Sequence, residues 1–252
     1  MCKFIDLSEV EQLQKALEPS KSVMGPGSEM AMISERQAAV WNEINRAFAD
    51  GIRSAEKVLE KAEVLGKFGW ALPMHASPRE LVWLVERSID LESANQVFRE
   101  YYTACGASRY RCLMTELVGD EALEKWRGYL QEIGQAYDQG LYRVCVPALF
   151  ATLDGIAYYN WTTKFYKSHG RQQFFKSKMN GLDSFDACIW QSVAAFVKIV
   201  FKEATPTNSE PMIVNRHWIL HGRGIPDGTQ TDCLRLLQAI HTFAFLAGAA
   251  SE

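Results

Sequence analysis

A polar stretch near the C-terminal end of the chain concentrates residue types that can do phosphate chemistry. Residues 215–222 read NRHWILHG, with one arginine, Arg216, and two histidines, His217 and His221. Arginine offers a permanently charged, planar set of N–H donors that matches phosphate oxygens, and histidine exchanges protons near neutral pH. Cleavage of RNA by its own 2′-hydroxyl needs both, because protons must move and the crowded phosphorus centre must be stabilised. The stretch is therefore a candidate nuclease site.

The spacing limits how these side chains can meet. Arg216 and His221 are five positions apart, so on a continuous helix they would point about 140° apart. They converge only if the helix ends near His221 or the arginine reaches around, and either suits a groove between two subunits. His217 and His221 share one helix face, a spacing that also occurs in half of a zinc site. No acidic residue lies between Glu210 and Asp227 to complete it, so we expect neither a metal nor a cofactor.

The stretch resembles the Arg-x4–6-His motif of the HEPN (higher eukaryotes and prokaryotes nucleotide-binding) ribonuclease family, with four residues between Arg216 and His221. The residue after the arginine is usually polar in that motif, and His217 fits. Upstream, residues 136–142 and 147–155 are similar to the first helical hairpin of bacterial members. The resemblance covers about residues 120–250.

The resemblance implies a metal-independent endoribonuclease in which two subunits face their motifs into a shared cleft. His221 would transfer the proton and Arg216 would stabilise the phosphate. His217 would orient the scissile group, with Asn215 in support. The products would carry 2′,3′-cyclic phosphate and 5′-hydroxyl ends.

The implied substrate is single-stranded RNA, and the implied setting is a toxin or an anti-phage defence protein with an antitoxin or regulatory partner. One alternative is a catalytically inactive HEPN module that binds RNA, a nucleotide or a protein. The other is a helical scaffold in which Arg216 pairs with a carboxylate and His221 ends its helix.

Two further features are candidate parts of the site. Asp154 is the one acidic residue in the apolar run 141–159, and because buried acids need a partner we expect it to pair with Arg216. Residues 156–181 hold basic and aromatic residues but no acidic ones. This pattern suits binding of phosphates and unpaired bases, and equally a solvated linker whose rings pack on the bundle. The residues assigned to RNA binding are Lys164, Lys167, Arg171, Lys176, Lys178 and Arg223.

Helices must position these residues, because apolar residues recur along the chain at helical spacing and strand-like alternation is scarce. A connector is expected over residues 66–78, followed by a helix with Ser77 at its N-cap and Pro78 in its first turn. Breaks are expected near Gly106 and Gly119. The sequence therefore predicts an all-α protein.

From residue 120 onward the pattern is clearest. It predicts an apolar stripe over 123–137 and a buried helix over 141–159, which Pro147 either kinks or starts. Further helices are expected over 189–200, 212–221 and 233–247. The last of these should be capped by Thr229 or Thr231. We therefore expect a C-terminal HEPN-like helical bundle over 116–252 and an N-terminal helical accessory region of unknown role over 1–115.

Composition bounds the remaining possibilities. The net charge of −3 in 252 residues argues against a broad electrostatic grip on duplex DNA or an anionic membrane. No apolar stretch is long enough for a membrane span and no secretory signal begins the chain, so we expect a cytoplasmic protein.

The six cysteines form no CxxC pair and are expected in the core. His75 is expected in a loop, His169 at the surface, and His241 in a structural role.

Overall fold

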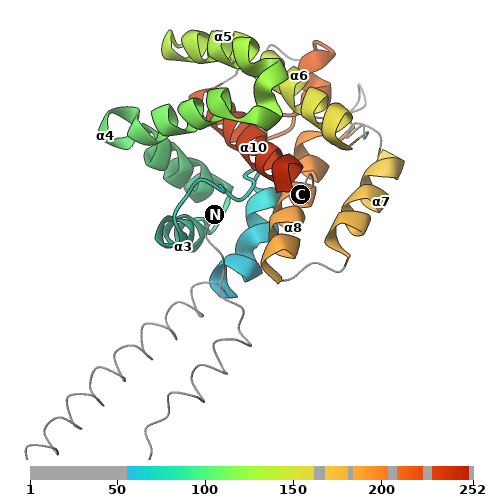
Figure 1. The fold of residues 1–252 in the computed structure, drawn as a ribbon. Helices are drawn as coiled ribbons and strands as arrows, with labels where there is room; N and C mark the ends of the chain where they lie inside the picture. The colour runs from blue at the N-terminus through green and yellow to red at the C-terminus, as the bar shows by residue number, and fades with distance from the viewer. Residues whose placement is uncertain (1–55, 162–167, 181–183, 204–208, 224–228, 250–252) are drawn as a thin grey trace, which may run out of the picture. The chain divides into compact units, whose positions relative to one another are not determined.

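The computed structural model describes residues 56–161, 168–180, 184–203, 209–223 and 229–249. Every regular element within these ranges is a helix, so the all-α prediction is confirmed (Figure 1). Residues 1–55 of the expected N-terminal accessory region lie outside the described residues. No helix in the described part of the chain is long and apolar enough to cross a membrane.

The first described elements are a helix over residues 56–67, a connector, and α3 (Pro78–Arg87). The start of α3 follows the predicted pattern. Ser77 accepts a hydrogen bond from the backbone N–H of Glu80, and the Glu80 carboxylate accepts one from the backbone N–H of Ser77 at 2.8 Å. This reciprocal cap satisfies two N–H groups that the first helical turn leaves without a partner.

Helix α4 (Leu91–Gly119) is broken in its middle, where the sequence predicts a break. Residues 104–107 leave helical geometry, and Cys105, Gly106 and Ala107 take φ values of 51°, 65° and 60°. Only glycine adopts this left-handed region without a steric cost, so Gly106 suits the break best. Two helical segments result, and the second ends at Gly119 as expected.

The predicted stripe over 123–137 is not one α-helix. It starts as the 3-10 helix η1 (Glu121–Trp126) and continues as α5 (Arg127–Asp138). The Asp120 carboxylate accepts a hydrogen bond from the Ala122 N–H at 2.8 Å and caps η1. The apolar residues still face inward, because Leu123 and Leu130 are fully buried.

Five helices complete the described fold: α6 (Tyr142–Trp161), α7 (Ser168–Met179), α8 (Ser184–Val200), α9 (Arg216–Leu220) and α10 (Gln230–Ala249). Helix α10 packs against both α6 and α4, α5 packs against α6, and α7 packs against α8 (Figure 1). Thr229 caps α10, since its hydroxyl accepts a hydrogen bond from the Asp232 N–H at 3.2 Å. The predicted helical bundle is therefore present.

Residues on both sides of the boundary expected at 115–116 contribute to one core. That boundary falls within α4, and residues from Ile52 to Glu252 form one compact unit. Trp70 stacks on Phe98 with ring centroids 4.3 Å apart, and the Thr242 hydroxyl on α10 donates to the carbonyl of Leu72 at 2.7 Å. The connector after residue 67 therefore packs directly on α10.

Two expectations about burial need correction. Helix α6 is not buried all round, because Val144, Tyr158 and Tyr159 are exposed. It also begins before Pro147, which lies inside the helix.

Three of the cysteines lie in the core as predicted, but Cys105 and Cys112 are exposed on α4, and Cys2 lies outside the described residues. The buried cysteines are Cys145, Cys188 and Cys233.

Candidate functional site

The candidate stretch begins with a buried asparagine that joins two helices. Asn215 is the N-cap of α9, and its side-chain oxygen accepts a hydrogen bond from the Trp218 N–H at 3.0 Å. Its amide nitrogen donates to the carbonyls of Ile199 and Lys202 at 3.2 and 3.0 Å. One side chain thus pairs with a backbone N–H at the start of α9 and with backbone carbonyls at the end of α8, groups that have no partner within their own helix. Asn215 positions the site rather than reaching into it.

Helix α9 is shorter than the expected span 212–221, and it ends as Gly222 predicts. His221 is the C-cap, and Gly222 follows with φ of 62°. The Arg223 N–H donates to the carbonyl of Trp218, and the Gly222 N–H to that of Ile219, both at 3.1 Å. These two bonds define a Schellman motif. Because the helix ends at His221, the 140° separation of a continuous helix does not fix where this side chain points.

Arg216 makes the predicted contact with Asp154. Its Nε donates to Oδ2 of Asp154 at 2.9 Å, and Nη2 lies 2.8 Å from the same oxygen. The side chains of Arg216 and Asp154 are 17% and 23% exposed, so the pair is partly buried at the contact of α6 with α9. Burial raises the pKa of Asp154, while the charge and hydrogen bond of Arg216 lower it in part. Asp154 thus holds one edge of a guanidinium that carries five N–H donors.

The two histidines of α9 lie side by side. The ring centroids of His217 and His221 are 4.4 Å apart, with His221 exposed and His217 half-buried. The pKa of His217 is lowered, first by desolvation and then by His221, Arg223 and Arg216. His217 is therefore neutral at neutral pH, and the motif residue whose ring lies beside it is His221.

The basic tract after α6 separates into different environments. Lys164 and Lys167 lie outside the described residues. Arg171 on α7 is half-buried and donates to the carbonyl of Phe201 at the end of α8, at 3.3 Å. Lys176 is exposed, whereas Lys178 lies over aromatic rings of α7 and α8. Within the described part of this tract, only Lys176 has the exposure expected of a phosphate-binding lysine.

The aromatic rings of the tract also divide into two groups. Phe175 is only 4% exposed, and the Trp161 and Phe174 rings pack against Trp190 with centroids 5.3 and 5.9 Å away. These rings hold α7 on the bundle, as the linker alternative supposed. Tyr158 and Tyr159 on α6 are instead 52% and 60% exposed. Exposed rings can stack on bases, and Tyr158 lies one helical turn beyond Asp154.

A second cluster of titratable side chains was not foreseen as a site. His75 of the connector, Glu116 of α4 and His241 of α10 each offer a nitrogen or oxygen atom, and these atoms lie within 4.8 Å of one another. The residues are 166 positions apart at the extremes, and no local spacing joins them. The only sequence signal was two histidines in apolar surroundings.

An open depression lies on another surface, against α3 and the broken α4. Tyr101, Arg109 and Cys112 are among its lining residues, and none of the predicted RNA-binding residues lines it.

Comparison with protein-family models, with curated proteins and with solved structures finds no match to this chain. Any assignment of function therefore depends on the residues and their geometry.

Proposed function

We propose that the chain is a metal-independent endoribonuclease of HEPN type, with Arg216, His217 and His221 as its reactive groups. The observation that carries the proposal is the grouping at α9, where a carboxylate holds the arginine and two imidazoles lie 4.4 Å apart. A fixed cation beside proton-transfer groups is what transesterification of RNA requires.

The proposed reaction uses the 2′-hydroxyl of the substrate as the nucleophile. A neutral imidazole accepts the 2′-hydroxyl proton while the 2′-oxygen forms a bond to phosphorus, and a protonated group returns a proton to the departing 5′-oxygen. We assign the main proton transfer to His221, which is exposed at the end of α9. His217 orients the scissile group, and Arg216 neutralises charge on the phosphate oxygens. The products are a 2′,3′-cyclic phosphate and a 5′-hydroxyl.

Substrate binding in this proposal uses the face of α6 next to the arginine. The exposed Tyr158 ring provides a surface on which an unpaired base stacks, a contact that is worth about 1–3 kcal/mol per base. Arg223 and Lys176 contribute phosphate contacts. Tyr158→Ala is then expected to raise KM for single-stranded RNA by about tenfold or more, with little effect on kcat.

The first experiment is cleavage of single-stranded RNA in EDTA by the full chain. His221→Ala and Arg216→Met are expected to lower the rate at least a hundredfold, because each removes a transition-state interaction. His169→Ala and Arg79→Met are the matched controls and should cleave like the parent. Binding without any product would favour the inactive HEPN module, and cleavage that EDTA abolishes in folded protein would contradict a metal-independent reaction.

A second experiment tests the proposed two-subunit site. Arg216→Met and His221→Ala chains are co-expressed with different tags, and the mixed dimer is isolated. If each site takes its arginine from one subunit and its histidine from the other, the mixed dimer keeps one intact site and about half of the parent rate. A monomeric protein would contradict the shared site, and a fully inactive mixed dimer would contradict a site whose arginine and histidine come from different subunits.

The toxin or defence setting is part of the same proposal. An active enzyme of this kind is expected to arrest growth when expressed without its antitoxin or regulatory partner, and the His221→Ala variant is expected to relieve the arrest. Equal growth with parent and variant would remove support for a toxin.

A further inference from the structure

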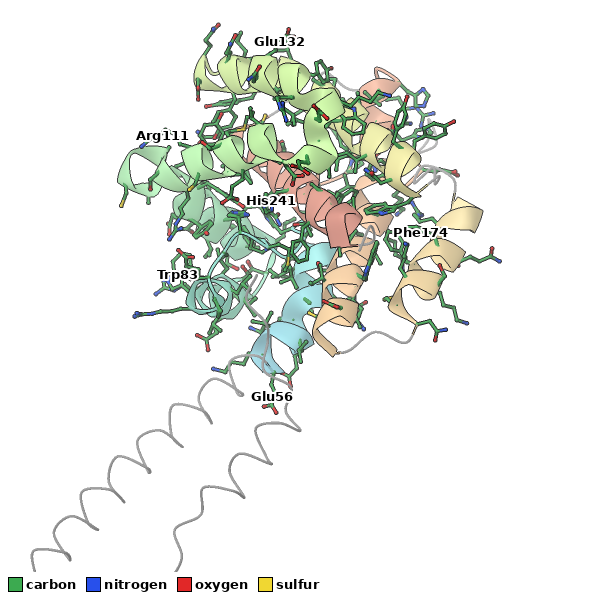
Figure 2. The ribbon with its side chains drawn as sticks, in the orientation of Figure 1. Glu56, Trp83, Arg111, Glu132, Phe174 and His241 are labelled. Atoms are coloured by element: carbon green, nitrogen blue, oxygen red, sulfur yellow. The ribbon has the colours of Figure 1, made fainter. Side chains whose placement is uncertain are left out.

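The cluster at the contact of α10 with α4 joins three elements. His241 on α10 lies where that helix passes α4 (Figure 2). Its Nε2 is 3.1 Å from a carboxylate oxygen of Glu116 on α4. Its ring lies edge-on to that of His75, with centroids 4.9 Å apart. Each of the three residues comes from a different segment, so a ligand held by all three would cross-link the fold.

Both imidazoles carry a buried nitrogen that has no hydrogen-bond partner among the described residues. These atoms are Nδ1 of His75 and Nδ1 of His241. A buried polar atom without a partner costs about 1–3 kcal/mol, so Nδ1 of His75 calls for an explanation such as an ion. Nε2 of His241 faces Glu116, so an ion bound between those two side chains leaves Nδ1 of His241 to a bound water. Nε2 of His75 lies 3.2 Å from the hydroxyl of Tyr102, which fixes the ring from outside the cluster. Metal-binding histidines are usually oriented in this way.

We propose that His75, Glu116 and His241 bind a divalent first-row transition metal ion, with Zn²⁺ as the best fit. Two imidazoles and one carboxylate form the donor set of several three-ligand zinc sites, and they suit Mg²⁺ or Ca²⁺ poorly. Ligands at about 2.0–2.1 Å from a tetrahedral zinc lie roughly 3.3 Å apart. The donor atoms lie within 4.8 Å of one another, so those farthest apart must approach by about 1.5 Å to reach that spacing.

The protonation of the cluster favours this ligand. Burial is the largest cause that lowers the pKa of His75 to about 3 and that of His241 to about 4, so both rings are neutral at pH 7 and can bind a metal without losing a proton. Burial also raises the pKa of Glu116, and a bound cation would reverse that shift. The Glu116 side chain is 46% exposed, which gives an ion access from solvent.

Titration of the chelator-treated full chain with ZnCl₂ in a calorimeter tests the site. We expect one zinc ion per chain, with no comparable binding of MgCl₂, and a melting temperature that rises by about 5–10 °C at a hundred times Kd. Glu116→Gln should weaken zinc binding about tenfold or more, and His241→Gln should weaken it further. If His241→Gln fails to fold, Glu116→Gln decides, because that side chain is half-exposed.

The matched control is the double variant His217→Gln/His221→Gln, which removes the other neighbouring pair of histidines. It should keep the zinc site intact, and Co²⁺ bound to it should show the same visible absorption bands as in the parent. The proposal is overturned if no zinc binds, if binding is lost in the control variant, or if Glu116→Gln and His241→Gln bind like the parent. None of these readouts depends on RNA cleavage, so this site and the proposed nuclease fail or succeed separately.

Discussion

Replacement of Arg216 by methionine tests the pairing on which the proposed site depends. The change keeps much of the side-chain volume but leaves the Asp154 carboxylate without its cation. Removing one partner costs about 3–5 kcal/mol for a fully buried pair and 0–1 kcal/mol for an exposed one. The two side chains are 17% and 23% exposed, so we expect a loss of about 2 kcal/mol at pH 7.

The loss should depend on pH in a direction set by Asp154. Burial already raises its pKa above the ordinary value of 3.8, and Arg216 opposes that rise, so the variant should raise it further. A carboxyl group whose folded pKa is raised binds its proton more tightly in the folded state, and stability falls as pH rises through the interval above 3.8. The deficit of Arg216→Met relative to the parent should therefore be larger at pH 7 than at pH 4.

Urea unfolding at pH 4 and pH 7 measures both quantities. Asp154→Asn is the companion variant, because it keeps the shape and one acceptor while it removes the buried charge. The free energy of unfolding of Asp154→Asn should differ from that of the parent by no more than about 1 kcal/mol, since burial is the larger influence on the pKa of Asp154. Its cleavage rate should nevertheless fall at least tenfold, because Arg216 loses the carboxylate that holds it in position. An Arg216→Met deficit that is absent, or equal at both pH values, would refute the electrostatic reasoning. Parent-like cleavage by Asp154→Asn would refute the positioning role.

Three other variants test the local geometry. Gly66→Ala should lose about 2 kcal/mol in urea unfolding, because the new methyl would overlap the backbone carbonyl oxygen of Ser192 and lie 2.6 Å from Cβ of Ala195. Such a clash costs up to ~3 kcal/mol, which exceeds the ~1 kcal/mol gain in helix propensity. His221→Ala should raise the pKa of His217 in an NMR titration, because His221 is one of the causes that lower it, and an unchanged midpoint would count against their proximity. Asn215→Ala should cost about 1–2 kcal/mol and lower cleavage, whereas a fully stable variant would show that α9 needs no cap.

The sequence predicted those parts of the fold that local chemistry decides. The cap formed by Ser77 and Glu80, the break at Gly106 and the end of α9 at Gly222 all follow from preferences within one or two turns. The pairing of Asp154 with Arg216 was also predictable, because a single acid in an apolar run needs a partner. That inference required no knowledge of the path between the two residues.

What could not be predicted depends on tertiary contacts. The stripe over 123–137 has helical periodicity throughout, and periodicity does not distinguish a 3-10 turn that Asp120 caps from an α-helix. The rings of Phe174 and Phe175 look like the exposed Tyr158 in the sequence, and only packing against Trp190 separates them. The His75–Glu116–His241 cluster required the fold itself, since its members come from three distant segments.

The proposed metal site and the proposed metal-independent reaction are physically compatible. His241 lies on α10, which packs against α6, and α6 carries Asp154. A zinc ion would therefore stabilise the scaffold behind the reactive residues without touching the phosphate. Removal of the ion should lower the melting temperature and leave the rate per folded molecule unchanged well below that temperature. Zinc that instead raised the rate at a temperature where both forms are fully folded would show that the ion takes part in the chemistry, and the division of roles between the two clusters would be wrong.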